Sequence, residues 1–126
     1  MNRFNGLESH SYINLETFRK SGIGVRTPVW FVEDGSTLFV RTDATSGKVK
    51  RIQNNGQVHV APCKMDGALL GDWMEASARV ADGEEIDRKV DRLLGKKYGF
   101  MKIIFSLASS LQRRKSTIIE IRVAEQ

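Results

Sequence analysis

A β-rich run passes directly into a short basic helix in the stretch Thr37-Leu38-Phe39-Val40-Arg41-Thr42-Asp43-Ala44-Thr45-Ser46-Gly47-Lys48-Val49-Lys50-Arg51. Ser46 can cap this helix. Its opening turns carry three cations, at Lys48, Lys50 and Arg51. Free N–H groups and the positive end of the helix dipole attract an anion at such a junction, and nearby Thr and Ser hydroxyls add donors. The stretch therefore predicts either a phosphate site or a basic, solvated helix start.

Around this stretch the chain reads as short strands with few helices. We expect strands over residues 26–33, 37–41, 58–63, 73–80 and 117–123, and helices over residues 15–22, 46–55, 82–94 and 100–111. The pair Asp34-Gly35 is typical of a hairpin turn between the first two strands. Short antiparallel strands with few helices predict a mainly β fold, a compact β-barrel with helices at its rim.

The last two predicted helices differ in how they should be buried. Residues 82–94 place Ile86, Val90, Leu93 and Leu94 on one apolar stripe, which is typical of a helix with one buried side. Residues 100–111 are apolar around most of the circumference, so we expect contacts with both the core and a second copy of the chain. Because lysines and arginines flank this segment, binding to a membrane surface is the alternative.

Composition limits the class of protein. The 126 residues are 40% hydrophobic and 28% charged, and they show no repeat or linker, so we expect a single soluble domain over residues 1–126. The net charge of +5 suits an anionic ligand, although it would also suit nucleic acid. One cysteine, Cys63, excludes an internal disulfide and fits a reducing cytoplasm. With neither a targeting signal nor a membrane-spanning stretch, a cytoplasmic location is expected.

Five segments carry a resemblance to a known family, in matching order and spacing. They are residues 26–31, 38–42, 46–52, 58–63 and 73–80. Together they resemble the pyridoxamine 5′-phosphate oxidase-like superfamily of flavin-binding split barrels, and most closely its deazaflavin-dependent reductases. The resemblance covers about residues 15–85, and in addition the final strand. It implies an FMN-binding split barrel of antiparallel Greek-key strands, and a homodimer with cofactor sites at the subunit interface.

The resemblance also implies which residues hold the cofactor. The flavin ring would lie beside the first of these strands, at Arg26, Thr27, Pro28, Val29 and Trp30. The ribityl phosphate would be held by Thr42, Ser46, Gly47 and Lys48, with Arg41 and Arg26 as helpers. An aromatic residue on a barrel strand usually packs in the core; the alternative is that Trp30 lines the ring pocket, or that Trp73 closes it from the partner subunit.

Two flavin-type cofactors are compatible with this site. FMN and the deazaflavin coenzyme F-420 both carry a phosphate after a ribityl chain. The deazaflavin also has an anionic oligoglutamate tail, which the positive net charge would favour. The cofactor performs hydride transfer and the protein binds and orients it, so the activity needs no acid–base constellation. We therefore expect an oxidoreductase that transfers hydride to a small organic acceptor.

Two departures from the family pattern separate this chain from the vitamin B6 oxidases. Those enzymes place a lysine for the substrate phosphate after the first flavin strand, where this chain has Phe31. Their later arginine-rich signature is missing as well. Val29, Trp30 and Phe31 instead predict a pocket for a flat, apolar acceptor such as a quinone or an enone. The proton that accompanies the hydride would come from water or from the cofactor.

Other kinds of site are not indicated. His10 and His59 lie far apart, and with one cysteine they give no metal-ligand spacing. We interpret His59 as a partly exposed strand residue and Cys63 as a small buried hydrophobe. The glycines form no dinucleotide fingerprint, and no catalytic side chain can be named. The alternatives to an enzyme are a non-catalytic flavin carrier or sensor, or a basic β-barrel that binds nucleic acid.

Overall fold

The computed structural model describes residues 6–7, 9–99 and 116–123 of the chain. Within them the elements follow in the order β1 (Tyr12–Phe18), β2 (Gly24–Trp30), β3 (Val32–Asp34), β4 (Thr37–Asp43), α1 (Gly47–Asn54), β5 (Gln57–Cys63), β6 (Met74–Ala81), α2 (Glu84–Tyr98) and β7 (Ser116–Val123). The predicted helix over residues 100–111 lies outside the described residues.

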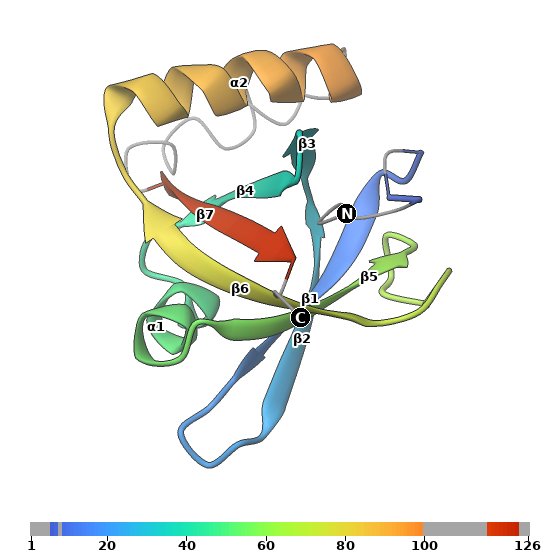
Figure 1. The fold of residues 1–126 in the computed structure, drawn as a ribbon, viewed down its shortest axis with the longest axis vertical. Helices are drawn as coiled ribbons and strands as arrows, with labels where there is room; N and C mark the ends of the chain where they lie inside the picture. Colours follow the sequence, from blue (N-terminus) through green and yellow to red (C-terminus); the bar gives the residue numbers. More distant parts are fainter. Residues whose placement is uncertain (1–5, 8, 100–115, 124–126) are drawn as a thin grey trace.

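The strands form one antiparallel sheet in the order β2-β1-β5-β6-β7-β4-β3. The sheet curls, so that β2, at one end of this order, comes into contact with β4, next to the other end. Figure 1 shows α2 lying across one side of the sheet over β4 and β7, whereas α1 lies beside β5 and β6. The predicted mainly β barrel with helices at its rim is confirmed.

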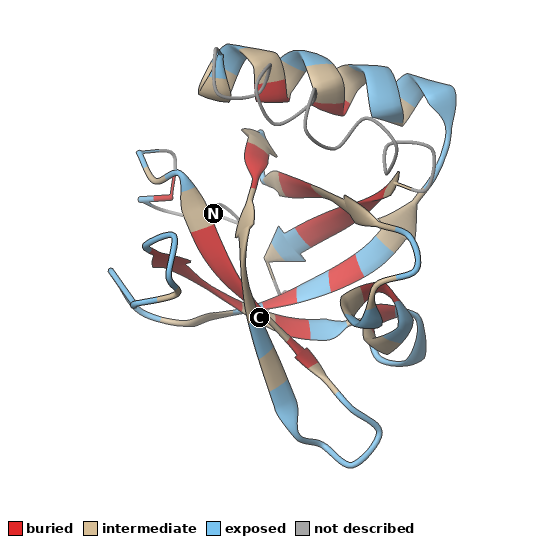
Figure 2. Cartoon of the chain, turned by 180° about the vertical axis from the view of Figure 1, so that it is seen from behind, coloured by how far each residue is buried: buried red, intermediate tan, exposed pale blue. Residues whose placement is uncertain are grey.

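The main core lies inside the curled sheet and is built from the inward-facing side chains of the strands. Successive side chains point to opposite faces, so every second residue turns inward. Helix α1 adds Val49 and Ile52 to this core. The other buried members are Leu7, Ile13, Leu15, Phe31, Leu38, Val40, Val58, Val60, Ala76, Ala78, Ile119 and Ile121. Figure 2 shows the resulting alternation of buried and exposed positions along the strands.

A second, smaller apolar cluster lies between the outer face of the sheet and α2. Val90 and Leu94 of α2 are buried, and Ile86 and Leu93 pack against the same cluster, so the predicted apolar stripe is confirmed. The sheet contributes Val32, Phe39 and Ile118. Because the outward-facing residues of β4 and β7 are apolar only beneath α2, the helix has one place to dock.

The predicted helix over residues 15–22 is wrong, because this segment belongs to β1 and the turn after it. Ile13, Leu15 and Thr17 are buried on the inner side, while Glu16 and Phe18 are only partly buried on the outer side. That is the period of a strand, and pairing with both β2 and β5 overrides the local helix preference. Gly22, with φ of 90°, belongs to the turn rather than to a helix end.

The predicted strand over residues 26–33 is interrupted at Phe31, where the chain bends from β2 into β3. Tyr98, at the end of α2, holds this bend. Its hydroxyl accepts a hydrogen bond from the Phe31 N–H at 3.0 Å and lies 2.8 Å from the carbonyl oxygens of Phe31 and Ser11. This contact also explains why α2 extends beyond the predicted residue 94.

Replacing Tyr98 with phenylalanine should lower the free energy of unfolding by about 1–2 kcal/mol, because the Phe31 N–H loses its acceptor in a partly buried place. Urea denaturation measures the change. Tyr12→Phe is the matched control, because the Tyr12 hydroxyl makes no hydrogen bond within the described part of the chain. Equal destabilisation by both substitutions would contradict a specific role for Tyr98.

Candidate cofactor site

The junction between β4 and α1 is built as a tight turn. Asp43, the last residue of β4, accepts hydrogen bonds from the Thr45 N–H at 2.8 Å and from the Thr45 hydroxyl at 2.7 Å. Its carbonyl oxygen also accepts from the Ser46 N–H at 3.0 Å. Ser46 is extended, with φ −68° and ψ 156°, and α1 begins at Gly47. The predicted helix over residues 46–55 is thus confirmed, with Ser46 at its N-cap.

Lys48 reaches back across this turn to the end of β4. Its Nζ donates to the Thr42 hydroxyl at 3.0 Å. Partial burial lowers the pKa of Lys48, the nearby Arg51 guanidinium lowers it further, and Asp43 acts in the opposite direction. A bound anion would favour the charged ammonium, because it adds an opposite charge to a partly desolvated cation. The structure therefore brings together Thr42, Ser46, Gly47 and Lys48, as predicted.

Ser46 supplies a test of whether an anion fits here. Its hydroxyl oxygen is buried and makes no hydrogen bond, not even the usual capping bond to the helix. The first turn of α1 also contains no acidic side chain that could neutralise the free N–H groups. A buried hydroxyl without a partner is costly. A phosphate oxygen at the helix start would satisfy both the hydroxyl and the N–H groups, so the donor set fits a phosphate.

Arg51 joins the same site from the next turn of α1. Its Nε donates to the buried Thr17 hydroxyl at 2.7 Å, which ties the helix to β1. Burial lowers the pKa of Arg51, and so does the nearby Arg19. A Cβ on Gly47 would lie 2.7 Å from Nη1 of Arg51, so the glycine leaves room for the guanidinium. The basic cluster was visible in the sequence, but this contact was not.

Strand β2 lies at one end of the strand order and leaves one edge unpaired within the described residues. Among the described residues β2 pairs only with β1, and its other side approaches β4. Backbone N–H and C=O groups along that edge are therefore available to a ligand, although Pro28 contributes no N–H. This is the strand on which the sequence predicts contacts with the flavin ring, from Arg26 to Trp30.

The pocket predicted from Val29, Trp30 and Phe31 is not formed by these side chains. Phe31 is fully buried in the main core, and Nζ of Lys97 lies 3.3 Å from its ring centroid. Trp30 stacks on Tyr98 with ring centroids 4.1 Å apart and planes inclined by 7°. Val29 packs against the core. The prediction that Phe31 lines an open pocket is wrong, since the bend between β2 and β3 turns this ring inward.

Arg41 is directed away from the β4–α1 junction. Its guanidinium forms ion pairs with Asp87 at 2.8 Å and Asp91 at 3.0 Å, both on α2. Arg41 and Thr42 are consecutive strand residues and so point to opposite faces of the sheet. The predicted phosphate helper therefore anchors α2 instead.

Arg26 and Trp73 meet in a separate cluster on the outer face of β1, β2 and β5. Nε of Arg26 lies 3.0 Å from Oε2 of Glu16, and its guanidinium carbon lies 4.8 Å from the Trp73 ring centroid. Oε1 of Glu16 lies 2.9 Å from Nδ1 of His59. Burial opposes ionisation of Glu16, but hydrogen bonds from His59 and Arg26 outweigh it and hold the pKa below its usual value. The sequence interpretation of His59 as partly exposed is confirmed, but its partner was missed.

Comparison with known proteins identifies the family and the fold of the chain. A family model described as pyridoxamine 5′-phosphate oxidase matches residues 4–126. The chain belongs to this family. No curated protein matches the sequence. Among solved structures of the same split-barrel fold, the heme storage protein HutZ of Vibrio cholerae is 13% identical, with a TM-score of 0.72 over 100% of this chain and 93% of that one. An F-420 reductase is 18% identical, with a TM-score of 0.63 over 97% of this chain and 94% of that one.

Two kinds of feature are missing from the part of the chain that the structure describes. No helix there is both long and apolar enough to cross a membrane. The same residues contain no group of three or more His, Cys, Asp or Glu side chains that could hold a metal ion.

Proposed function

We propose that this member of the pyridoxamine 5′-phosphate oxidase family binds a flavin-type cofactor, FMN or the deazaflavin coenzyme F-420, and transfers hydride to a small organic acceptor. The observation that carries the proposal is the buried, unpartnered Ser46 hydroxyl at the start of a basic helix. Thr42, Lys48 and Arg51 surround the same place, and β2, whose edge is unpaired among the described residues, contacts β4, the strand that leads to it. Membership of a family that includes oxidoreductases supports it further.

The residues of the chain have separate tasks in this proposal. Lys48 and Arg51 neutralise the phosphate, while Ser46 and the first N–H groups of α1 donate hydrogen bonds to it. The free edge of β2 orients the planar ring through backbone groups. When bound, the cofactor supplies the hydride chemistry. Of the two cofactors, the net charge of +5 and the similarity to an F-420 reductase favour the deazaflavin with its anionic tail.

Oxidation of vitamin B6 phosphates is not part of the proposed activity. By resemblance, the B6 oxidases carry a lysine that binds the substrate phosphate at the place where this chain has Phe31. The ring of Phe31 is buried in the core. Lys97 approaches this place, but its Nζ donates to the Phe31 carbonyl oxygen at 3.0 Å and is thus already engaged. The acceptor that we propose instead is a quinone or an enone, because such a flat, weakly polar molecule can lie against the flavin ring without a pocket formed by Val29, Trp30 and Phe31.

The test combines binding with turnover. The purified protein is titrated with FMN and with coenzyme F-420, and the absorbance band of each cofactor is followed. The reduced complex is then mixed with a panel of quinones, enones and pyridoxine phosphate. Saturable binding with oxidation by a quinone or enone supports the proposal. Binding without oxidation favours a flavin carrier or sensor, and rapid formation of pyridoxal phosphate contradicts the assignment at Phe31. A protein that binds neither flavin but shows a heme band would resemble the heme storage protein in function as well as in fold.

Nucleic-acid binding has less support than flavin binding. Proteins that bind single strands expose aromatic rings for base stacking. The large hydrophobic side chains exposed in the described part of the chain are Ile23, Met65, Leu69 and Leu70, and none is aromatic. An affinity for oligonucleotides that falls steeply with salt would overturn this assignment.

We propose further that the protein is a homodimer with its cofactor sites at the interface. Three apolar side chains, Met65, Leu69 and Leu70, are exposed near one another along the chain in the segment between β5 and β6, as expected of a contact with another copy. Sedimentation equilibrium should therefore give the mass of a dimer, and Leu70→Asp should shift the equilibrium towards monomer. A monomeric wild type with full cofactor affinity would contradict the dimer.

A further inference from the structure

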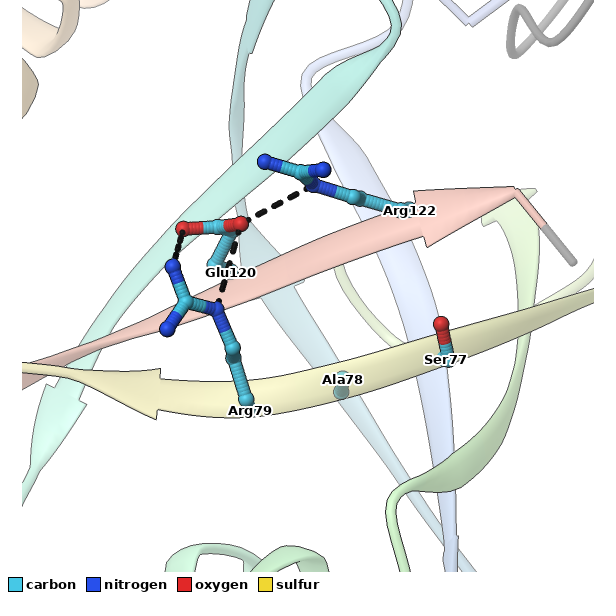
Figure 3. Close-up of a pocket in the computed structure, with 5 residues that line it drawn as sticks. All are labelled: Ser77, Ala78, Arg79, Glu120 and Arg122. Atoms are coloured by element: carbon cyan, nitrogen blue, oxygen red, sulfur yellow. Dashed lines mark hydrogen bonds and ion pairs between the residues drawn. The ribbon is translucent and has the colours of Figure 1, made fainter.

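A second polar cluster lies on the outer face of β6 and β7. Glu120 of β7 is paired in register with Arg79 of β6, and Arg122 follows two residues later on the same face. Arg79 binds the Glu120 carboxylate side-on, with Nε 3.3 Å from Oε1 and Nη2 3.0 Å from Oε2. Nε of Arg122 lies 3.0 Å from Oε1. Figure 3 shows the three side chains gathered over the same side of the two strands.

Burial divides this cluster into a buried anion and two accessible cations. The Glu120 side chain is only 7% exposed, whereas those of Arg79 and Arg122 are 70% and 66% exposed. Each guanidinium has five N–H donors, and Glu120 occupies two from Arg79 and one from Arg122. Within the described part of the chain, the remaining N–H groups of the two arginines have no other hydrogen-bond partner. Two cations and one carboxylate leave one net positive charge.

The cluster surrounds a depression large enough for a small ligand. Its volume is about 340 Å³, and it is lined by Ser77, Ala78, Arg79, Glu120 and Arg122. Stability alone does not account for this arrangement, because one arginine would be enough to pair a buried carboxylate and a second adds a like charge beside the first. An oxyanion bridging the two guanidinium groups would relieve that repulsion. The Ser77 hydroxyl adds a donor on the same side (Figure 3).

We propose that Arg79, Arg122 and Ser77 form a binding site for the oxyanion of a small molecule, a carboxylate or phosphate group, and that Glu120 is a positioning residue. Glu120 fixes the orientation of both guanidinium groups before the ligand arrives. The planar fork of arginine matches either oxyanion. This site is distinct from the β4–α1 junction, and it does not depend on the proposed flavin chemistry.

The test follows the arginine Nε–H signals by NMR in nitrogen-15-labelled protein. Sodium phosphate and sodium succinate are titrated separately at constant ionic strength. We expect saturable shifts at Arg79 and Arg122 with at least one of them, and whichever binds identifies the oxyanion. Arg122→Gln should weaken binding by about tenfold or more, because it removes a charge-assisted contact. Arg88→Gln changes the net charge equally on α2 and should have no effect.

Two further variants keep the outcome decisive. Lys48→Ala removes the main cation of the β4–α1 junction, so shifts at Arg79 and Arg122 that persist in it belong to the outer site. Arg79→Gln repeats the test if Arg122→Gln alters the amide spectrum of the fold. Shifts that grow linearly without saturation, or equal affinity in wild type and Arg122→Gln, would overturn the proposal. So would saturable shifts confined to the residues around Lys48.

Discussion

Lys48→Ala lowers the affinity for the flavin-type cofactor roughly ten- to hundredfold, if the β4–α1 junction holds its phosphate. The substitution removes a charge-assisted contact worth about 1.5–3 kcal/mol. In the protein without cofactor, Lys48 donates to the Thr42 hydroxyl, and burial, which lowers the pKa of Lys48, opposes its charged form. The thermal midpoint of the cofactor-free protein should therefore change little. Absorbance titration with FMN and coenzyme F-420 measures the affinity.

Lys50→Ala is the matched control for this prediction. Lys50 lies on the same helix, carries the same charge and is exposed. A general effect of net charge would lower the affinity equally in both variants, whereas a site at the junction is affected by Lys48 alone. Unchanged affinity in Lys48→Ala would show that the cofactor phosphate does not bind at this junction. The unpartnered Ser46 hydroxyl would then have another explanation.

The sequence predicts the grouping of residues at the β4–α1 junction because they are nearly contiguous, whereas the phosphate itself stays a prediction. Thr42, Ser46, Gly47 and Lys48 lie within seven residues, so the local geometry of a strand end and a helix start is enough to bring them together. The orphaned hydroxyl of Ser46 was not predictable in the same way. The side chain of a serine at the N-cap usually accepts a capping hydrogen bond, and only the folded structure shows that the Ser46 hydroxyl makes none.

Features that depend on strand register could not be predicted. Glu16 meets Arg26 and His59 only because β1 pairs with both β2 and β5, whereas the sequence pattern predicts a helix at Glu16. Glu120 meets Arg79 through the pairing of β6 with β7. Once the strands and their register are known, opposite charges at paired positions are a usable signal. Without the register, these residues are unconnected charges in the chain.

Side-chain direction explains the errors at the predicted site. Arg41 is adjacent to Thr42, but alternation turns it towards α2, where Asp87 and Asp91 bind it. Phe31 follows the β2 edge, but the bend into β3 turns its ring into the core. In both cases proximity in sequence does not give proximity in space. On a strand, consecutive residues lie on opposite faces, so every second residue is the better candidate for a shared site.

Lys97 should make the stability of the protein increase with pH above about 8. Its ammonium lies over the Phe31 ring and donates to the Phe31 carbonyl oxygen. Burial lowers the pKa of Lys97 from 10.5 to about 8, and the nearby Glu33 limits the decrease. Between these two values the unfolded chain binds more protons than the folded protein, so stability rises with pH. The stabilisation is complete above the ordinary pKa of lysine and is lost as the pH falls through 8.

The comparison that isolates this effect is wild type against Lys97→Met, with urea denaturation at intervals from pH 7 to pH 10.5. The difference in unfolding free energy between the two proteins should change in favour of the wild type by up to about 3 kcal/mol across that range. Cys63 and Tyr98, whose pKa values burial raises, oppose folding at alkaline pH in both proteins and so cancel in the difference. Lys96→Met, at the exposed neighbouring position, should leave the difference constant. A constant difference for Lys97→Met as well would show that this lysine keeps its ordinary pKa in the folded protein, and that the contact with Phe31 costs the ammonium nothing.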